Sequence, residues 1–213
     1  MKALYKQLYE SLLAKHGPQK WWPVKHSFAP QEFEICVGAI LTQNTSWRNA
    51  EKALQNLSDA KITSADKIAE MPLPKLQKLI KPSGFYRQKS KRLKNFCVFV
   101  KNFNGNFYKE VTREQLLALN GIGRETADSI LLYACGRPCF VVDAYTRRML
   151  SRLGLIGGGE GYEEIRQLFE KALPKDVNMF REFHALIVED GKAHARNPAN
   201  HRSRNRAAIS RTV

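Results

Sequence analysis

Two short stretches of the sequence carry residues whose types and spacing could do chemistry. The first is Gly121-Ile122-Gly123, which separates two segments whose apolar residues recur three and four positions apart. Two glycines allow backbone angles that a β-carbon forbids, so we expect a tight turn between two helices, with Ile122 packed between them. Such a turn would present backbone N–H groups at the start of the second helix, which is a binding site for an anion such as a DNA phosphate.

The second stretch is Phe140-Val-Val-Asp143, in which an acid follows a short apolar run. We expect the carboxyl group of Asp143 to lie buried at the head of the next helix. A buried carboxylate can stabilise a developing cation or orient and deprotonate a water molecule. The alternative is that Asp143 serves only as the N-cap of that helix.

The elements that must position these residues read as helices throughout. No stretch shows sustained alternation of apolar and polar residues, so the predicted fold class is all-α. Before the turn, the inner face of the preceding helix carries Leu116, Leu117 and Leu119. The second helix starts near Arg124 and buries Ala127, Ile130, Leu131 and Ala134. We expect one helical lobe over residues 26–137, a second lobe from residues 1–25 plus 138–190, and a mobile basic tail over 191–213.

Composition narrows the class of partner. The 213 residues carry a formal net charge of +15, which favours a polyanion through counterion release. A ribosomal or membrane-surface protein is the alternative, but 43% of residues are hydrophobic, which indicates a globular chain. No run approaches the roughly 20 apolar residues of a membrane span, and the N-terminus lacks the pattern of a signal peptide. We expect a cytoplasmic protein of a prokaryote, a monomer that associates with the nucleoid through DNA.

The glycine turn and Asp143, which follows Gly123 by 20 residues, together resemble the helix-hairpin-helix DNA glycosylases of the endonuclease III family. The resemblance covers about residues 19–192. It implies a two-lobed fold with the active-site cleft between the lobes, a hairpin that clamps the DNA backbone, and an Asp that does the chemistry. The hairpin residues implied to contact DNA are Gly121, Ile122, Gly123, Arg124 and Thr126.

Two further segments match family motifs. In Leu41-Thr-Gln-Asn-Thr45 the resemblance places Gln43, with Asn44 beside it, at the gap left when a nucleotide leaves the duplex. In Gly84-Phe-Tyr-Arg-Gln-Lys89 it makes Phe85 an apolar wedge opposite the vacated base. Beside Phe85, the basic residues Arg87 and Lys89 suit DNA phosphates. The alternatives are a polar helix junction at Gln43, and a solvated helix face with Phe85 in the core.

The sequence also departs from the family in two places. Bifunctional members carry a Lys two residues after the second hairpin glycine, and here that position is Glu125, which cannot form the Schiff base of a lyase. An acid in a first helical turn also complements the helix dipole, which is the simpler account of Glu125. The cysteines are Cys36, Cys97, Cys135 and Cys139, so the family's iron–sulfur cluster, held by four C-terminal cysteines, cannot form. We expect no cofactor and no metal site.

The three tryptophans bear on the substrate. The segments with Trp21-Trp22-Pro23, Trp47 and Val141-Val-Asp143 look like the 3-methyladenine glycosylase branch, whose aromatic base sandwich maps to Trp21 and Trp47. Trp22 and Glu125 are placed in the same base pocket. Indole rings suit an N-alkylated purine because such a base is cationic. One departure is that a pocket Lys of that branch falls at Leu186. The alternative for the tryptophans is core packing.

The resemblance therefore predicts a base excision repair enzyme, a monofunctional glycosylase that flips an alkylated purine out of duplex DNA and hydrolyses its N-glycosidic bond. Two alternatives stay open. One is an endonuclease III-like glycosylase for oxidised pyrimidines or mismatches, and the other is a helix-hairpin-helix protein that binds DNA without catalysis.

Overall fold

A computed structural model describes residues 2–22 and 24–196, and every regular element in those residues is helical. The expected all-α fold is confirmed. The chain divides into two compact units, Trp22–Val141 and a second unit made of Met1–Trp21 with Val142–Val213. Among the described residues, no helix is long and apolar enough to cross a membrane.

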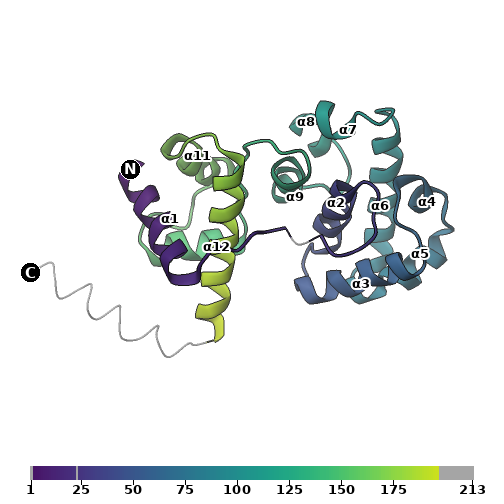
Figure 1. Ribbon diagram of the computed structural model, residues 1–213, viewed down its shortest axis with the longest axis horizontal. Helices are drawn as coiled ribbons and strands as arrows, with labels where there is room; N and C mark the ends of the chain where they lie inside the picture. The colour runs from purple at the N-terminus through teal and green to yellow at the C-terminus, as the bar shows by residue number, and fades with distance from the viewer. Residues whose placement is uncertain (1, 23, 197–213) are drawn as a thin grey trace, which may run out of the picture. The chain divides into compact units, whose positions relative to one another are not determined.

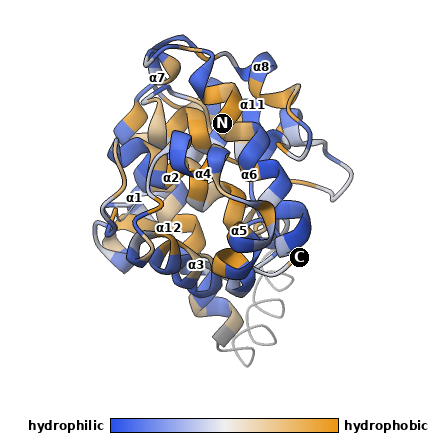
Figure 2. Ribbon diagram, turned by 90° about the vertical axis from the view of Figure 1, so that its right-hand side faces the viewer, coloured by the Kyte–Doolittle hydropathy of each residue, from blue (hydrophilic) through white to orange (hydrophobic). Residues whose placement is uncertain are grey.

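The unit Trp22–Val141 is built around α2 (Gln31–Leu41), in which every residue from Phe33 to Leu41 is buried. A helix that is buried all round must be enclosed by others, and α3, α6 and α9 pack on it (Figure 1). Figure 2 shows the outer helices with hydrophilic residues on their outward faces and hydrophobic residues inside. The remaining helices of this unit are α3 (Trp47–Asp59), α4 (Ala65–Glu70), α5 (Leu73–Ile80), η1 (Lys81–Ser83), α6 (Tyr86–Lys101), α7 (Phe107–Glu110), α8 (Arg113–Leu117), α9 (Arg124–Ser129) and η2 (Ile130–Ala134).

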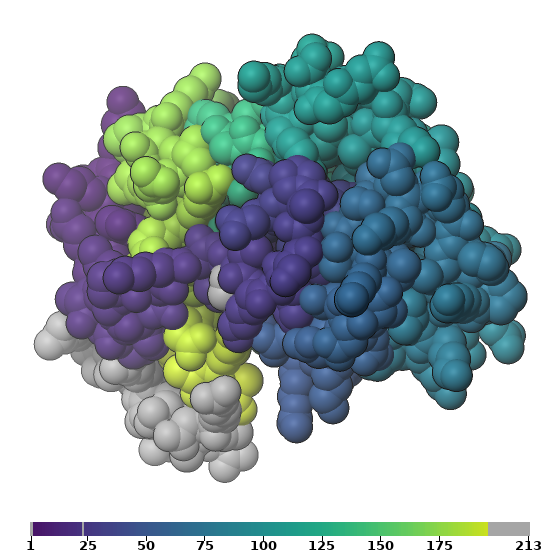
Figure 3. Space-filling model, turned by 45° about the vertical axis from the view of Figure 1, so that its right-hand side comes forward, coloured from purple at the N-terminus to yellow at the C-terminus, as the bar shows by residue number. Residues whose placement is uncertain are grey.

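The other unit joins the two ends of the chain. It contains α1 (Lys2–His16), α10 (Ala144–Arg152), α11 (Tyr162–Ala172) and α12 (Val177–Arg196). The long helix α12 packs against both α1 and α10, and Figure 3 shows its yellow-green surface directly beside the purple N-terminal helix. Rings of Tyr5, Phe169 and Phe183 fill the core between α1, α11 and α12 with edge-to-face contacts.

The boundaries of the two units differ by a few residues from those predicted at 25/26 and 137/138. Trp22 belongs to the first unit because its ring packs edge-on against Trp47, with centroids 5.1 Å apart, and against Tyr133 at 5.2 Å. At the other end, Cys139 Sγ donates to Asp128 Oδ1 at 3.0 Å and so ties the segment before Val142 to the same unit. Side-chain packing, rather than loop composition, fixes both boundaries.

The predicted tail begins too early. Residues 191–196 continue α12, and the helix does not end at Gly191. His194 Nδ1 lies 2.8 Å from the carbonyl oxygen of Asp190, and Lys192 pairs with Glu189 at 3.4 Å, so these residues are tied to the helix. The rest of the predicted tail, 197–213, lies outside the described residues.

Candidate active site

The glycine turn is a helical hairpin between α8 and α9. Gly121 has a φ of +86°, which an L side chain rarely adopts, and Ile122 is 5% exposed between the helices. Gly123 is the N-cap of α9, and Ala127 N donates to its carbonyl oxygen at 2.9 Å. The first-turn amides of α9 therefore start at an exposed glycine, the arrangement that suits an anion.

The inner residues of the hairpin agree with the expected pattern except at the end of the first helix. Leu116 is fully buried, but Leu117, the last residue of α8, and Leu119 beyond it are only half-buried. On the second side, the buried residues are Ala127, Ile130, Leu131 and Ala134. The segment Ile130–Ala134 is a π-helix, a form that is frequent at functional sites.

A partly buried ion pair that the sequence analysis did not identify clamps the two hairpin helices together. Arg113 on α8 donates from Nε to Asp128 Oδ1 at 2.6 Å and from Nη2 to Oδ2 at 3.0 Å. Asp128 on α9 is fully buried. A bidentate guanidinium–carboxylate pair fixes geometry as well as charge, so the turn between α8 and α9 is held rigidly. Sequence alone gives no signal for this pairing because the partners lie 15 residues apart on different helices.

Gln43 binds the hairpin, so it does more than form a polar junction between helices. Its Nε2 donates to Gly121 O and to Thr126 Oγ1, both at 2.9 Å, and its Oε1 accepts from Arg92 Nη1 at 2.8 Å. These bonds surround a cavity of about 430 Å³. The cavity is lined by Gln43, Asn44, Arg92, Gly121, Ile122, Gly123, Glu125 and Thr126. All of these except Arg92 are named above as predicted DNA-contact or pocket residues, and Arg92 follows Arg87 and Lys89 in the basic run predicted to suit DNA phosphates.

Phe85 is not a core residue. Its side chain is 62% exposed, and its backbone is left-handed, with φ of +45°, directly after Gly84 at +67°. Holding a non-glycine residue there costs about 1–2 kcal/mol, and exposing a phenyl ring gains nothing in the free protein. The strain and the exposure together favour a role in contact with a partner. Arg87, two residues on, is also exposed.

Lys89 requires a correction, because the structure does not leave it available to DNA. Its side chain is 1% exposed, and Nζ donates to Leu41 O at 2.8 Å and Ser83 O at 2.7 Å. Burial, together with the nearby charge of Arg92, lowers the pKa of Lys89 to about 8. The ammonium group satisfies carbonyl oxygens where α2 and η1 end, so its role is structural. The basic residues that surround Lys89 in the sequence had suggested an outward face.

The aromatic residues fall in both units. In the Trp22–Val141 unit, Trp22 and Trp47 meet at an interplanar angle of 87°, and Gly38 of α2 lies beneath both indoles. A β-carbon at Gly38 would stand 3.4 Å from Trp22 and 3.5 Å from Trp47, so any larger side chain would displace them. Tyr133 of η2 completes this cluster and was not predicted. All three tryptophans are half-buried rather than enclosed in the core.

Asp143 caps α10 and also faces a histidine. Its Oδ1 accepts from Thr146 N at 2.7 Å and from Thr146 Oγ1 at 2.9 Å, which is N-cap geometry. The other oxygen, Oδ2, lies 3.7 Å from Nε2 of His184 on α12. Burial acts to raise the pKa of Asp143, but His184 and the two Thr146 donors outweigh it and hold the pKa below its usual value. The carboxyl group is therefore ionised at neutral pH.

The surroundings of Asp143 in its own unit include an indole and an ammonium group. Trp21 lies with its ring centroid 6.0 Å from that of His184, and Lys192 Nζ is 5.5 Å from the Trp21 ring. His184 itself is 5% exposed. Leu186, the position of the pocket Lys in the resembled branch, is fully buried. The single cleft predicted to join this group to the hairpin and to Trp22, Trp47 and Glu125 stays a prediction.

Glu125 lies on the first turn of α9, exposed and within the hollow beside Gln43. It occupies the position that carries the lyase amine in bifunctional relatives, and a carboxylate there offers no amine to a sugar. Within the described residues, no group of three or more His, Cys, Asp or Glu side chains has the arrangement of a metal site.

Comparisons with known proteins agree with this geometry. The model of the HhH-GPD superfamily of base excision DNA repair proteins matches residues 37–175. A protein of Methanocaldococcus jannaschii that carries a provisional name as a DNA repair glycosylase is 48% identical over 204 residues, covering 92% of this chain and 90% of its own. Endonuclease III of Thermotoga maritima is 32% identical over 146 residues, covering 68% of this chain and 67% of its own.

Among solved structures, the 3-methyladenine DNA glycosylase MagIII of H. pylori, bound to 1,N6-ethenoadenine, superposes with a TM-score of 0.75 and 36% identity. The match covers 88% of this chain and 96% of that one. The hairpin, the capped Asp143 and these matches lead to one conclusion: the chain belongs to the HhH-GPD superfamily of base excision DNA repair proteins and is a DNA glycosylase of the endonuclease III-like type.

Proposed function

We propose that this glycosylase excises alkylated purines such as 3-methyladenine from duplex DNA by hydrolysis alone, without a lyase step. The observation that carries the proposal is the pair of acids at the two reactive positions. Asp143 is ionised and held by Thr146 and His184, and Glu125 occupies the place of the lyase amine. Asp143 supplies a carboxylate that can stabilise a sugar cation, and the hairpin position supplies no amine to capture one.

The reaction follows from these groups. As the N-glycosidic bond of the flipped nucleotide breaks, its electron pair leaves with the base and positive charge develops on the sugar. The carboxylate of Asp143 stabilises that charge, and a water molecule adds to C1′ while its proton passes to Asp143 or to solvent. The products are a free base and an abasic site. A cationic N-alkylated purine leaves as a neutral molecule, so no side chain has to protonate it.

The aromatic residues support the choice of substrate class. Stacking on an indole contributes about 1–3 kcal/mol per base, and a cationic base gains further from the electron-rich ring face. Trp22 and Trp47 are half-buried around Gly38, and Trp21 lies on the side of Asp143 and His184. MagIII, with which the chain shares 36% identity, is named for 3-methyladenine. We propose that the enzyme uses no iron–sulfur cluster, since no cysteine follows Cys139.

The test is base release from duplex DNA that contains 3-methyladenine or 7-methylguanine, measured under single-turnover conditions. Wild type should release free base, and Asp143→Asn, which keeps an N-cap side chain, should slow release by about 10²–10⁴-fold. Thr146→Ser, which retains the hydroxyl donor to Oδ1, is the matched control and should stay near wild type. Equal release by wild type and Asp143→Asn would refute the assignment of Asp143.

The relationship to Endonuclease III supports one other candidate, a glycosylase for oxidised pyrimidines or mismatches. The two candidates are separated by measuring base release from DNAs with different lesions and by adding borohydride to trap any protein–DNA imine. Our proposal predicts release of alkylated purines and no protein–DNA adduct, because only an imine is trapped. Release of oxidised pyrimidines, or a trapped adduct, would favour the other candidate. Tight DNA binding without release of any base would instead indicate a non-catalytic helix-hairpin-helix protein.

A further inference from the structure

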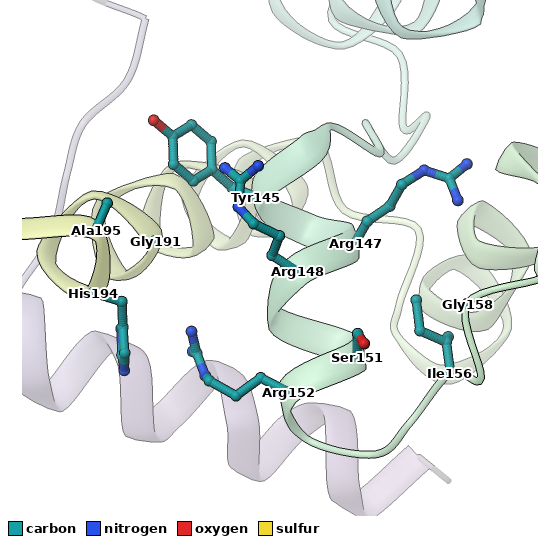
Figure 4. A pocket seen from close by; sticks show the side chains of 10 residues that line it. All are labelled: Tyr145, Arg147, Arg148, Ser151, Arg152, Ile156, Gly158, Gly191, His194 and Ala195. Atoms are coloured by element: carbon teal, nitrogen blue, oxygen red, sulfur yellow. The ribbon is translucent and has the colours of Figure 1, made fainter. Parts of the chain in front are cut away.

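A basic pocket lies in the unit Met1–Trp21 with Val142–Val213, and neither the hairpin nor Asp143 lines it. It is a cavity of about 690 Å³ between α10, the C-terminal part of α12 and the loop after α10. Figure 4 labels the residues that line it, which are Tyr145, Arg147, Arg148, Ser151, Arg152, Ile156, Gly158, Gly191, His194 and Ala195. Among these described residues are three arginines and a histidine, and none is an acid.

Arg148 offers its charge to the pocket. Its guanidinium carbon lies 4.5 Å from the centre of the Tyr145 ring, and the residue is exposed. A stacked guanidinium keeps its N–H groups at the edge of the plane, where they can bind the oxygens of a phosphate in pairs. Gly191 makes this possible, because a β-carbon there would overlap the Tyr145 ring. The ring that supports Arg148 is thus set against the backbone of α12.

The other charges leave an excess of positive charge. Arg152 pairs with Asp190 at 2.7 Å, and the same buried carboxylate also receives Lys15 at 2.6 Å, His16 at 3.1 Å and His194 at 3.2 Å. One acid therefore serves two permanent cations and two imidazoles. Burial acts to raise the pKa of Asp190, but its hydrogen bonds with Lys15 and His16 and the charge of His194 bring the pKa to about 2.

Another acid of this region, Glu160, is engaged by backbone amides. The carboxylate of Glu160 accepts from Gly157 N at 2.7 Å and Gly158 N at 2.9 Å, so it closes the loop after α10. Arg147 donates to the carbonyl oxygen of Glu160 at 2.9 Å, and in Figure 4 it points away from Arg148 and Arg152. Arg148, Arg152 and His194 consequently line the wall between α10 and α12, and the two guanidinium groups supply its positive charge.

We propose that this pocket binds a phosphate group of the DNA backbone, as a second backbone contact in addition to the hairpin. An arginine fork stacked on a ring, as Arg148 is on Tyr145, in a pocket with excess positive charge, matches phosphate in geometry and in sign. The hollow is larger than a single phosphate, as a continuous polyanion requires. The proposal rests on the proposed function only in that the ligand is DNA, and it is independent of which base is excised.

The test measures binding of undamaged duplex DNA by fluorescence anisotropy over a range of salt concentrations, with the full chain. Arg148→Gln should weaken binding by about 3–10-fold and reduce the slope of log K against log salt by about 1, as the loss of one phosphate contact predicts. Arg148→Lys, which keeps the charge without the fork, should retain most of the slope. Lys175→Gln removes an equal charge from an exposed position of the same unit outside the pocket and should match wild type.

Two results would overturn the proposal. Equal slopes and affinities for Arg148→Gln and Lys175→Gln would show that the pocket does not contact DNA. Calorimetric titration with dAMP separates the two sources of a phosphate. The pocket would serve a free nucleotide if wild type binds dAMP and Arg148→Gln does not, while both show the same slope of log K against log salt with DNA. In that case the DNA assignment is wrong. Because no base release is measured, failure of the glycosylase proposal would leave these outcomes unchanged.

Discussion

The two glycines of the hairpin should respond in opposite ways to the same substitution. Gly121 has a left-handed backbone, and a β-carbon added to it would overlap Nε and Cδ of Arg92. Gly123 has φ of −87° and ψ of 177°, which any residue adopts, and a β-carbon there meets nothing within 4 Å. Gly121→Ala and Gly123→Ala therefore form a matched pair, identical in chemistry and two positions apart.

The magnitude for Gly121→Ala follows from two contributions. Alanine in a left-handed conformation costs about 1–2 kcal/mol. Displacing Arg92 also breaks its hydrogen bond to Gln43 Oε1, and a bond from a charged donor is worth about 1.5–3 kcal/mol at most, less here because Arg92 is only half-buried. We expect the free energy of unfolding to fall by about 2–4 kcal/mol. For Gly123→Ala, the alanine restricts the unfolded chain, which raises the free energy of unfolding by about 0.4–1 kcal/mol. This gain offsets the loss from alanine being a poorer N-cap than glycine.

Urea unfolding and DNA binding together test this reasoning. Gly121→Ala should lower the urea midpoint by about 1 M, if the free energy of unfolding falls by about 3 kcal/mol per molar urea. Gly123→Ala should keep the wild-type midpoint but bind DNA about tenfold more weakly, because its methyl group would stand where a phosphate approaches the α9 amides. A wild-type midpoint for Gly121→Ala would refute the strain argument. Unchanged DNA affinity for Gly123→Ala would refute the role of the amides.

Two further predictions concern single side chains. Phe85→Ala should lower the rate of base release at subsaturating DNA about tenfold or more, because the apolar wedge is lost. Val98 on α6 is also exposed, at 54%, and Val98→Ala should leave the rate of base release unchanged. Equal effects of the two variants would contradict the role of Phe85 as a wedge. The pKa of Asp190 is lowered from 3.8 to about 2. The ionised carboxylate therefore adds about 2 kcal/mol to the free energy of unfolding above pH 4, and this contribution is lost as the pH falls through 2. Urea unfolding of Asp190→Asn and wild type should therefore differ by a constant amount from about pH 5 to 7 and by less below about pH 4, whereas a constant difference down to about pH 2 would disprove the linkage.

Local patterns were sufficient to predict much of this protein. Apolar spacing located the helices on both sides of the turn, and the pair of glycines located the turn itself, because helix period and left-handed backbone depend on neighbouring residues. The sequence likewise shows directly that position 125 carries a Glu rather than a Lys and that no cysteine follows Cys139. The capped position of Asp143 could also be read from an acid that follows an apolar run.

Tertiary structure decided which side chains meet. Lys89 was expected to face DNA, but the carbonyl oxygens at the ends of α2 and η1 bind it inside the protein. The Arg113–Asp128 clamp, the approach of His184 to Asp143, and the two basic side chains and two imidazoles around Asp190 bring together residues from different helices. Sequence by itself determined the backbone elements, since their rules are local. Only the folded chain decided how charges and rings are paired, because burial and distance arise from packing between helices.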